Sequence, residues 1–357
     1  MTNQPTKRAS IHDVARSAGV SAATVSKVLR GVTTVKAANA QKVHAAVEAM
    51  GYKMDPLAAG LRQTTRKIIG LIVPDLESEF FGKIAARLEI LAEEAGYSLS
   101  IVSSHESEAR EERLVERMHV WRVAGTILAP VRSERGAGTL LMKSLSMTGA
   151  LIDRVVSDDI YDTVAVDNAG ASAKVARLLA EKGHRHVTLI GLNEVSRNVR
   201  TRASAFKQEA QTICPDMRVD VLMIDEREDN FRAHLSDYLD ANHPSVVFSL
   251  FQKGTLIALS EFRRRGLRCP QDVSLVGFDD TEWMQVTYPA VSAVVQPISK
   301  LADHAFHRLL ARIEGQRDGT NSASICHLEP CSLQLRESLV EVPPVLPAEQ
   351  PHVIQGA

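Results

Sequence analysis

Residues 10–30, SIHDVARSAGVSAATVSKVLR, contain the first side chains whose types and spacing indicate a chemical role. A helix over the second half of this stretch would turn one face outward, and that face carries Ala22, Ala23, Ser26, Lys27 and Arg30. Lysine and arginine donate hydrogen bonds to phosphates and base edges, and serine hydroxyls contact phosphates. The pattern indicates a helix face that could lie in a groove of DNA. The alternative is a helical hairpin of an ordinary bundle.

Two short helices and a tight turn would position this face. Ser10 can cap the first helix, and Asp13, three residues later, can complete a capping box. Gly19 stands where that helix needs a left-handed residue in order to stop, and Ser21 can cap the second helix. Apolar residues at helical spacing face inward, and a third helix is expected over residues 38–50. These features predict a small all-α helix-turn-helix head.

The charge of the chain is divided unevenly, although its formal net charge is −1. Residues 1–67 hold eleven lysines and arginines against three acids, a net charge of +8, so the other 290 residues carry −9. A basic head on an acidic body suits binding to a phosphate polymer that repels the body. This division favours the helix-turn-helix over the helical hairpin.

Motifs typical of enzymes and metal proteins are missing from the sequence. It has no G-x-S-x-G motif and no P-loop, and residues 136–141, GAGTLL, lack the third glycine of a dinucleotide-binding motif. The four cysteines have no zinc-site spacing, and the histidines of GHRH, His184 and His186, are more typical of solvated or capping positions than of a metal site. The sequence therefore predicts no catalytic residue, no metal and no cofactor.

Segments that would direct the chain to a membrane are also missing. The sequence has neither the N-terminal apolar segment of a secretion signal nor an apolar run of membrane-spanning length. We therefore expect a cytoplasmic protein with reduced thiols and no membrane partner.

From Lys67 onward, short apolar runs alternate with amphipathic helical stretches. The expected strands are residues 68–73, 97–102, 124–130, 149–152, 186–191, 219–224, 245–250 and 273–278. The expected helices are residues 79–95, 106–119, 169–183, 200–212, 230–241 and 254–265. This alternation predicts parallel sheets, with more elements than one doubly wound domain contains. We expect an α/β core of two doubly wound lobes with a ligand cleft at the carboxyl ends of the strands.

Several motifs, in this order, resemble the lactose-repressor/galactose-repressor (LacI/GalR) family of bacterial transcription regulators. They are IHDVARSAGVSAATVSKVL, AVEAMGY with DPLAAGLR, IGLIVPDLESEFFGKI, AVDNAGASAKVARLLAEKGHRHVTLIG, and CPQDVSLVGFDD with QPISKLADHAFHRLL. The resemblance covers residues 10 to about 338. It implies a helix-turn-helix domain over residues 1–54, a hinge helix over 55–66, and an effector-binding core over 67–340 that is similar to periplasmic sugar-binding proteins.

The resemblance also implies how the core is divided. The chain would cross between the lobes three times, so that the first lobe holds about residues 67–166 and 297–328 and the second about 167–296 and 329–340. The tail, residues 341–357, lacks the heptad pattern by which some members form tetramers. We therefore expect a homodimer that binds a roughly palindromic operator.

DNA contacts within the head follow from the same resemblance. The base-contacting positions are Ala22, Ala23 and Lys27. Because alanine has no hydrogen-bonding side chain, Lys27 would make the polar base contact. The phosphate-contacting and capping positions are Ser10, Ser21, Thr24 and Ser26, together with Arg30 and Lys36, where relatives carry Asn and Ser. Thr24 and Ser26 could equally be ordinary surface residues, and the two cations could be solvated.

Leu61 matches the hinge leucine that family members insert into the central base step of the minor groove. Such a wedge bends the duplex and costs roughly a few kcal/mol for unstacking. The alternative is that residues 55–66 form a plain interdomain linker.

Effector contacts are implied in the cleft. Asp279 and Arg202 match a ligand-binding aspartate and arginine, which accept hydrogen bonds from and donate them to sugar hydroxyls. The other matching positions are Asp153, Phe80, Phe81, Gln252 and Trp283. As alternatives, Asp279 could cap the next segment, either phenylalanine could lie in the core, and Trp283 could pack at the lobe interface.

One departure from the family affects the expected ligand. Where relatives have VFCGND or VFCGGD, this chain has VFSLFQK, so Phe251 and Gln252 replace polar and acidic residues. The pocket becomes more aromatic and less acidic on that side, while Arg197 and Arg200 add positive charge nearby. A neutral mono- or disaccharide is the expected effector, and a sugar acid or phosphate is the alternative.

Two classes of function fit these features. The first is a DNA-binding transcriptional repressor whose operator affinity is changed by a small sugar or sugar acid through a population shift. The second is a sugar-binding protein without regulatory activity. The basic head and the hinge favour the repressor, since a transport receptor would carry an export signal instead.

Overall fold

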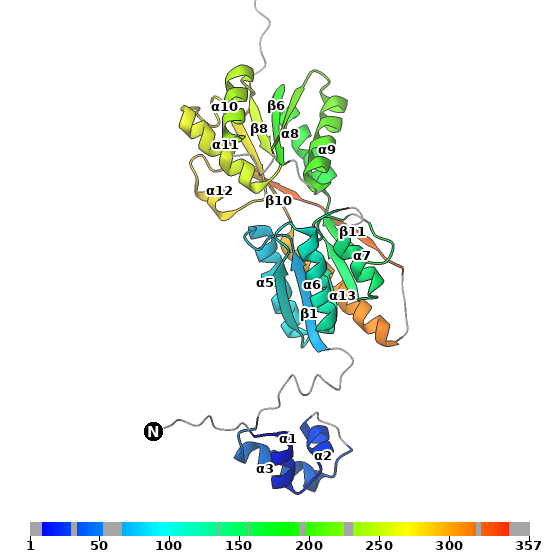
Figure 1. Ribbon diagram of the computed structural model, residues 1–357. Helices are drawn as coiled ribbons and strands as arrows, with labels where there is room; N and C mark the ends of the chain where they lie inside the picture. Colours follow the sequence, from blue (N-terminus) through cyan, green and yellow to red (C-terminus); the bar gives the residue numbers. More distant parts are fainter. Residues whose placement is uncertain are drawn as a thin grey trace, which may run out of the picture. The chain divides into compact units, whose positions relative to one another are not determined.

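The computed structural model describes residues 9–29, 34–52, 66–133, 136–155, 157–192, 197–224, 231–318 and 323–342 (Figure 1). The chain divides into two compact units, Met1–Arg66 and Lys67–Ala357. We call the first unit the head and the second the core. Among the described residues, no helix has both the length and the apolar character that crossing a membrane requires.

The head consists of three helices around a small apolar centre. They are α1 (Ile11–Ala18), α2 (Ala22–Leu29) and α3 (Ala37–Ala49). Val14, Val25 and Val43, one from each helix, have no exposed surface. Burial of one branched side chain from each helix fixes how the three helices pack, because apolar area removed from water stabilises the contact. The predicted helix-turn-helix head is confirmed.

The first lobe of the core is a six-stranded sheet with helices on both faces. Its strands, in spatial order, are β11 (Cys326–Glu329), β5 (Asp162–Val166), β4 (Gly149–Ile152), β3 (Val123–Leu128), β1 (Arg66–Val73) and β2 (Ser98–Ser103). Alternate residues of β1 point to opposite faces, so that Ile69 and Leu71 pack toward α5 (Glu79–Glu94) and α13 (Ile298–Asp318). Ile72 packs toward α6 (Glu108–Val120) and α7 (Ala137–Ser144) on the other face.

The second lobe repeats this architecture. Its strands, in spatial order, are β12 (Ser332–Gln334), β10 (Ser292–Val295), β9 (Ser274–Phe278), β8 (Val246–Ser249), β6 (His186–Leu192) and β7 (Arg218–Ile224). The short strand β12 is antiparallel to β10, and the other described pairs are parallel. Helices α8 (Asn168–Glu181) and α9 (Arg197–Ile213) cover one face, while α10 (Phe231–Asn242) and α11 (Gln252–Arg265) cover the other. A short helix, α12 (Glu282–Val286), follows β9.

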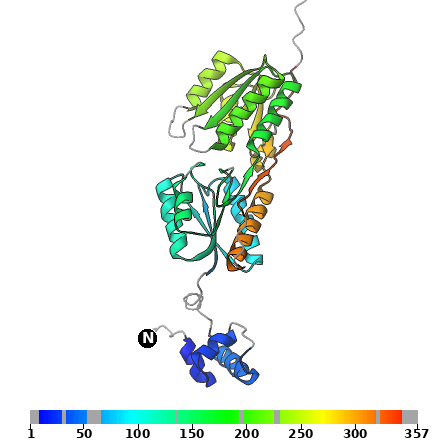
Figure 2. The same ribbon diagram turned by 90° about the vertical axis from the view of Figure 1, so that its right-hand side faces the viewer.

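Three segments join the lobes, and Figure 2 shows them running side by side. They lie between β5 and α8, between β10 and α13, and between β11 and β12. Two of them are tied together, because the Asp167 N–H donates to the Glu329 carbonyl oxygen at 2.8 Å. The two doubly wound lobes predicted from the sequence are confirmed. Four short strands, β5, β10, β11 and β12, were not among the predicted ones.

Candidate functional site

The start of the head is held by the predicted capping box. Ser10 is the N-cap of α1, where its Oγ accepts a hydrogen bond from the Asp13 N–H at 3.3 Å. In return, the Ser10 N–H donates to Asp13 Oδ2 at 3.0 Å. Gly19 ends the helix with a left-handed backbone, φ 64°. Helix α1 therefore has a defined start at Ser10 and a defined end at Gly19, from which the turn leads to α2.

Helix α2 presents a narrow outward face. Ser21 precedes it, and the Thr24 N–H donates to Ser21 Oγ at 3.2 Å. Ala23 and Lys27 are exposed and stand four residues apart, so they lie on one side of the helix. Ala22 is half-buried and packs against the apolar centre of the head. The exposed surface of α2 thus combines one small apolar side chain with one cation.

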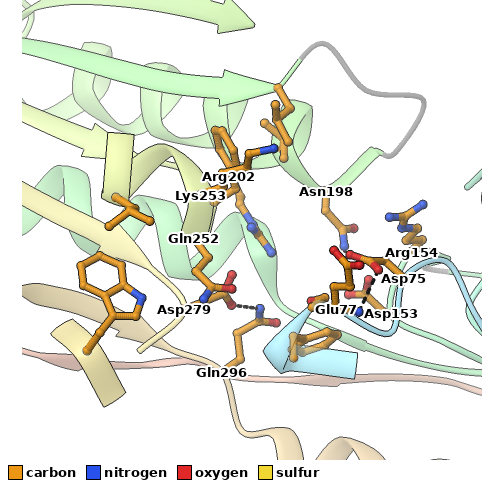
Figure 3. Close-up of a pocket in the computed structure, with 17 residues that line it drawn as sticks. Asp75, Glu77, Asp153, Arg154, Asn198, Arg202, Gln252, Lys253, Asp279 and Gln296 are labelled. Atoms are coloured by element: carbon orange, nitrogen blue, oxygen red, sulfur yellow. Dashed lines mark hydrogen bonds between the residues drawn. The ribbon is translucent and has the colours of Figure 1, made fainter. Parts of the chain in front are cut away.

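A cavity of about 460 Å³ is lined by residues of both lobes of the core (Figure 3). Its lining residues follow the carboxyl ends of strands in both sheets, which is the usual ligand position in open α/β folds. We call it the pocket. Its lining residues are Asp75, Glu77, Ser78, Phe80, Asp153, Arg154, Leu192, Asn198, Val199, Arg202, Phe251, Gln252, Lys253, Leu256, Asp279, Trp283 and Gln296.

Two acids occupy equivalent places in the two lobes. Asp153 directly follows β4, and Asp279 directly follows β9. Both have a left-handed backbone, with φ of 69° and 73°. Their N–H groups donate to the Val164 carbonyl oxygen at 2.8 Å and to the Val294 carbonyl oxygen at 3.0 Å. This conformation is uncommon outside glycine, and it turns each carboxylate out of its strand and into the pocket.

Arg202, on α9, is held firmly at the wall of the pocket. It is 5% exposed, and its Nε donates to Asn168 Oδ1 at 2.7 Å while its Nη1 donates to the Leu250 carbonyl oxygen at 2.7 Å. The guanidinium carbon lies 3.5 Å from the centre of the Phe278 ring. Figure 3 shows the guanidinium group pointing into the space beside Asp279. A planar donor group held in this way is suited to oriented hydrogen bonds with a polar ligand.

The two acids are poorly solvated. Burial raises the pKa of Asp153 and of Asp279 above the ordinary value, and the positive charge of Arg202 opposes the rise in both. Asn198 Nδ2 donates to Asp153 Oδ1 at 2.9 Å, and Gln296 Nε2 donates to Asp279 Oδ1. Carboxylates withdrawn from water in this way favour a ligand that brings hydrogen-bond donors.

Gln296 also offers an acceptor to the pocket. Its side chain is 8% exposed, and its Oε1 atom is buried without a hydrogen-bond partner among the described residues. A buried acceptor without a donor costs about 1–3 kcal/mol. A ligand hydroxyl placed here would remove that cost.

Aromatic rings contribute unequally to the pocket. Phe80 lines it, whereas Phe81 is 5% exposed, lies in the core of the lobe, and is not among the lining residues. Consecutive residues of a helix point about 100° apart, so both rings of the pair cannot face one cavity. Trp283 lines the pocket and also packs against the core of the second lobe.

Comparison with known proteins identifies the chain. Residues 10–55 match the profile of bacterial regulatory proteins of the lacI family, and residues 176–339 match the profile of the periplasmic binding protein-like domain. The chain has the two domains of LacI-family regulators. Its relative PtxS of Pseudomonas aeruginosa, an HTH-type transcriptional regulator, is 29% identical over 316 residues, which cover 87% of this chain and 91% of PtxS.

Solved structures show the same LacI-family fold. The Lac repressor dimer bound to operator and the anti-inducer ONPF superimposes with a TM-score of 0.80 at 22% identity, covering 94% of this chain and all of that one. The transcriptional regulator CelR in complex with cellobiose superimposes with a TM-score of 0.68 at 23% identity, covering 93% of this chain and all of CelR. The chain is thus a DNA-binding transcriptional regulator, and its relatives are regulators rather than enzymes.

Most of the predicted site residues lie in the part of the chain that the structure describes. Ser10, Ser21, Ala23, Lys27 and Lys36 are exposed on the head, and Ala22, Thr24 and Ser26 are half-buried. Asp153, Arg202, Gln252, Asp279, Phe80 and Trp283 all line the pocket. Arg30 and Leu61 lie outside the described residues.

Sequence reasoning missed part of the pocket of this regulator. The unpredicted polar lining residues are Asp75, Glu77, Ser78, Arg154, Asn198, Lys253 and Gln296. Gln296 could have been found, because it opens the quoted motif QPISKL directly after an apolar run. Asn198 carries no such signal, since a polar residue on an amphipathic helix is ordinarily solvated.

Proposed function

We propose that this LacI-family regulator is a repressor that binds a two-fold symmetric operator as a homodimer and changes its operator affinity when a small sugar occupies the pocket. The proposal rests on one observation in the core. Acids from both lobes, Asp153 and Asp279, line the same cavity as the fixed guanidinium group of Arg202 and the unpartnered oxygen of Gln296. A polyhydroxylated ligand supplies donors and acceptors to all four groups at once.

The charge of the pocket supports a neutral sugar over a sugar acid. Four acids line it, namely Asp75, Glu77, Asp153 and Asp279. Among the lining cations, Arg154 is already engaged by a two-point contact with Glu106 at 2.5 and 2.7 Å. A carboxylate on the ligand would meet more negative than positive charge. CelR, which has the same fold, was solved with the neutral disaccharide cellobiose.

A thermal-shift screen of the full chain tests the effector class. Neutral mono- and disaccharides and the corresponding sugar acids are compared at equal concentration, because a ligand that binds the native state raises the melting temperature. We expect a shift with a neutral sugar that Asp279→Asn removes and that the exposed control Asp237→Asn retains. A shift produced by sugar acids alone would assign the pocket to anions, and no shift from either set would refute the effector proposal.

Head removal separates a regulator from a sugar-binding protein without regulatory activity. An operator is first selected from random DNA with the full chain. Deletion of residues 1–62 should abolish binding to it and leave the sugar-induced thermal shift intact. If the deleted chain still binds the selected DNA, the head is not the DNA-binding unit.

Within the head and hinge, we propose that Lys27 makes the polar base contact and that Leu61 is the minor-groove wedge. Lys27→Ala should relax the preference for one base pair of the operator, with a loss of about 1–3 kcal/mol in the discrimination against the wrong base.

Leu61→Ala should weaken operator binding more than binding to random DNA, since a wedge acts through the bent specific complex. Equal weakening on both DNAs would count against the wedge.

A further inference from the structure

A second cluster of polar side chains lies away from the pocket, on the first lobe. His304 is on α13, and His327 and Glu329 are on β11. Both imidazoles approach the same carboxylate atom, with Nε2 of His304 at 3.0 Å and Nε2 of His327 at 2.7 Å from Glu329 Oε1. The two rings lie against each other at a tilt of 33°, with centroids 4.2 Å apart. One potential ligand atom from each of the three residues lies within 4.8 Å of the other two.

The fold dictates this convergence. Residues 327 and 329 are alternate positions of one strand, so both side chains point to the same face of the sheet. Helix α13 covers that sheet and packs over its neighbouring strand β5, which brings His304 beside them. Cys326 and Leu328, at the other two positions of the strand, are exposed on the opposite side. Neither one shares the face of the histidines.

The burial of the three groups is graded. The Glu329 side chain is 8% exposed, whereas His327 is 37% and His304 is 46% exposed. A buried carboxylate requires a polar partner, and Glu329 has two, the Nε2 atoms of His304 and His327 on its solvent-accessible side. Arg308, one turn further along α13, is engaged elsewhere through an ion pair with the buried Asp162 at 3.1 Å. The cluster therefore has a closed acidic floor and an open, imidazole-lined mouth.

We propose that His304, His327 and Glu329 form a binding site for a divalent transition-metal ion of the zinc class. Two imidazole nitrogens and one carboxylate oxygen are a donor set for such ions, whereas Mg²⁺ and Ca²⁺ prefer oxygen ligands. Each histidine binds the ion through the lone pair of Nε2, so the single proton of the neutral ring stands on Nδ1, and a proton carried by Nε2 before binding is exchanged for one on Nδ1 through solvent. Water completes the coordination at the open mouth.

Small movements are enough to admit the ion. Zinc bonds of about 2.0–2.1 Å in tetrahedral geometry separate neighbouring ligand atoms by roughly 3.3 Å. The two nitrogens lie 3.0 and 2.7 Å from the carboxylate oxygen, so each must retreat by a few tenths of an ångström. The half-exposed side chain of His304 can do this without disturbing the lobe core.

The site also ties together two of the segments that join the lobes. His304 lies in the second turn of α13, shortly after the segment that leaves β10. Glu329 is the last residue of β11, immediately before the segment that leads to β12. A metal bond between them clamps these two segments and should raise the melting temperature of the full chain.

Metal titration of the full, tag-free chain tests this site. After treatment with a chelator, the protein is titrated with ZnCl₂ and separately with MgCl₂ by calorimetry, with the melting temperature as a second measure. We expect one equivalent of zinc to bind and stabilise the protein, and magnesium to do neither. His304→Ala and His327→Ala should each weaken zinc binding at least about tenfold. His234→Ala, at an exposed position of α10, should bind zinc like the parent.

Folding and ligand identity are checked independently. Circular dichroism establishes that the variants keep the parent fold, and Glu329→Gln provides a third variant that retains the shape of the side chain. X-ray absorption at the zinc edge should report nitrogen and oxygen ligands that include two imidazoles. Absence of zinc binding, equal binding by the histidine variants and the parent, or sulfur coordination would each overturn the proposal.

Discussion

Lys36 occupies the N-cap of α3, a position at which a hydroxyl or carboxylate side chain usually accepts a helix N–H. Its side chain makes no capping hydrogen bond and is exposed. Ser10 shows the contrast within the same head, because it does cap its helix. The chain therefore has a cation in place of a stabilising cap, which is understandable if Lys36 contacts a phosphate of the operator.

Replacement of Lys36 should separate stability from DNA binding. Lys36→Ser restores a cap and should stabilise the head by about 0.5–2 kcal/mol, measured by amide exchange in α3. It should also weaken operator binding and lower the slope of log affinity against log salt by about 0.9.

Lys36→Ala serves as the matched control, because it removes the charge without adding a cap. Equal stability of the Ser and Ala variants would show that the hydroxyl does not cap α3. An unchanged salt slope in both would show that Lys36 contacts no phosphate.

The buried carboxyl group of Asp153 lowers the stability of the fold when no ligand fills the pocket. It is 6% exposed, and burial is the largest cause of its raised pKa, ahead of the opposing charges of Arg154 and Arg202. Because the folded-state pKa is raised, this carboxyl stabilises the fold fully below its unfolded-state pKa, and that contribution is lost as the pH rises through the folded-state value.

Asp153→Asn should therefore be more stable than the parent at pH 7, by about 0.5–2 kcal/mol, and should lose sugar binding. The difference should shrink as the pH falls through the raised pKa of Asp153, where the parent carboxyl also becomes neutral. Urea unfolding at several pH values measures this difference. A variant that is less stable at every pH would mean that Arg202 compensates the buried charge in full.

At the scale of elements, His184 holds three parts of the second lobe together. It follows α8, has no exposed surface, and its ring nitrogens lie 2.9 Å from Ser245 Oγ and 3.1 Å from the Val340 carbonyl oxygen. The sequence indicated a solvated or capping histidine here, and the structure places it in a buried link. Burial lowers its pKa from 6.5 to about 4.

The lowered pKa makes stability depend on pH in a definite direction. A group with a depressed folded-state pKa contributes stability above its unfolded-state value of 6.5, and that stability is lost as the pH falls toward 4. At pH 5 the loss from His184 is about 2 kcal/mol. His184→Gln should flatten the pH dependence of urea unfolding between pH 7 and 5 by that amount. If parent and variant have parallel pH profiles, His184 does not titrate in this way.

The sequence predicted elements well where their apolar periodicity is strong. Each of the eight predicted strands is found within two residues of its expected bounds, as are α5 and α8, because the apolar residues of these segments recur at the period of a strand or of a helix. The strands β11 and β12 escaped prediction since they are short and mostly exposed. Each of them forms a strand because it pairs with the edge of a sheet, so the cause is tertiary packing and not the local sequence.

The pocket was predictable where a residue directly follows a strand and unpredictable where distant elements meet. Asp153 and Asp279 belong to the first kind, and both line the cavity. Asn198 belongs to the second, since its role depends on reaching Asp153 across the fold, whereas Gln296 directly follows β10, a strand that was not predicted. His304 and His327 likewise converge from a helix and a strand that are far apart in sequence, so no metal motif announces them.

The whole molecule repeats one lobe plan twice. In both lobes the acid of the pocket follows the fourth strand that the chain adds to that sheet, and its N–H bonds to the next strand, so that two equivalent carboxylates line one cavity. A ligand that bonds to both favours one arrangement of the lobes over others, and it can shift that equilibrium only by its difference in affinity for the two states.

Coupling between the pocket and the operator should therefore be reciprocal. If the sugar changes operator affinity by some factor, typically about 5- to 150-fold, a saturating operator must change sugar affinity by the same factor. Asp279→Asn should abolish the response to sugar and leave operator affinity without sugar as in the parent, while Asp237→Asn should behave as the parent in both. Fluorescence anisotropy of labelled operator and calorimetry of the sugar measure the two factors. Unequal factors would mean that sugar and operator do not act on one equilibrium between two states of the dimer, and a sugar response that persists in Asp279→Asn would place the effector contact elsewhere in the core.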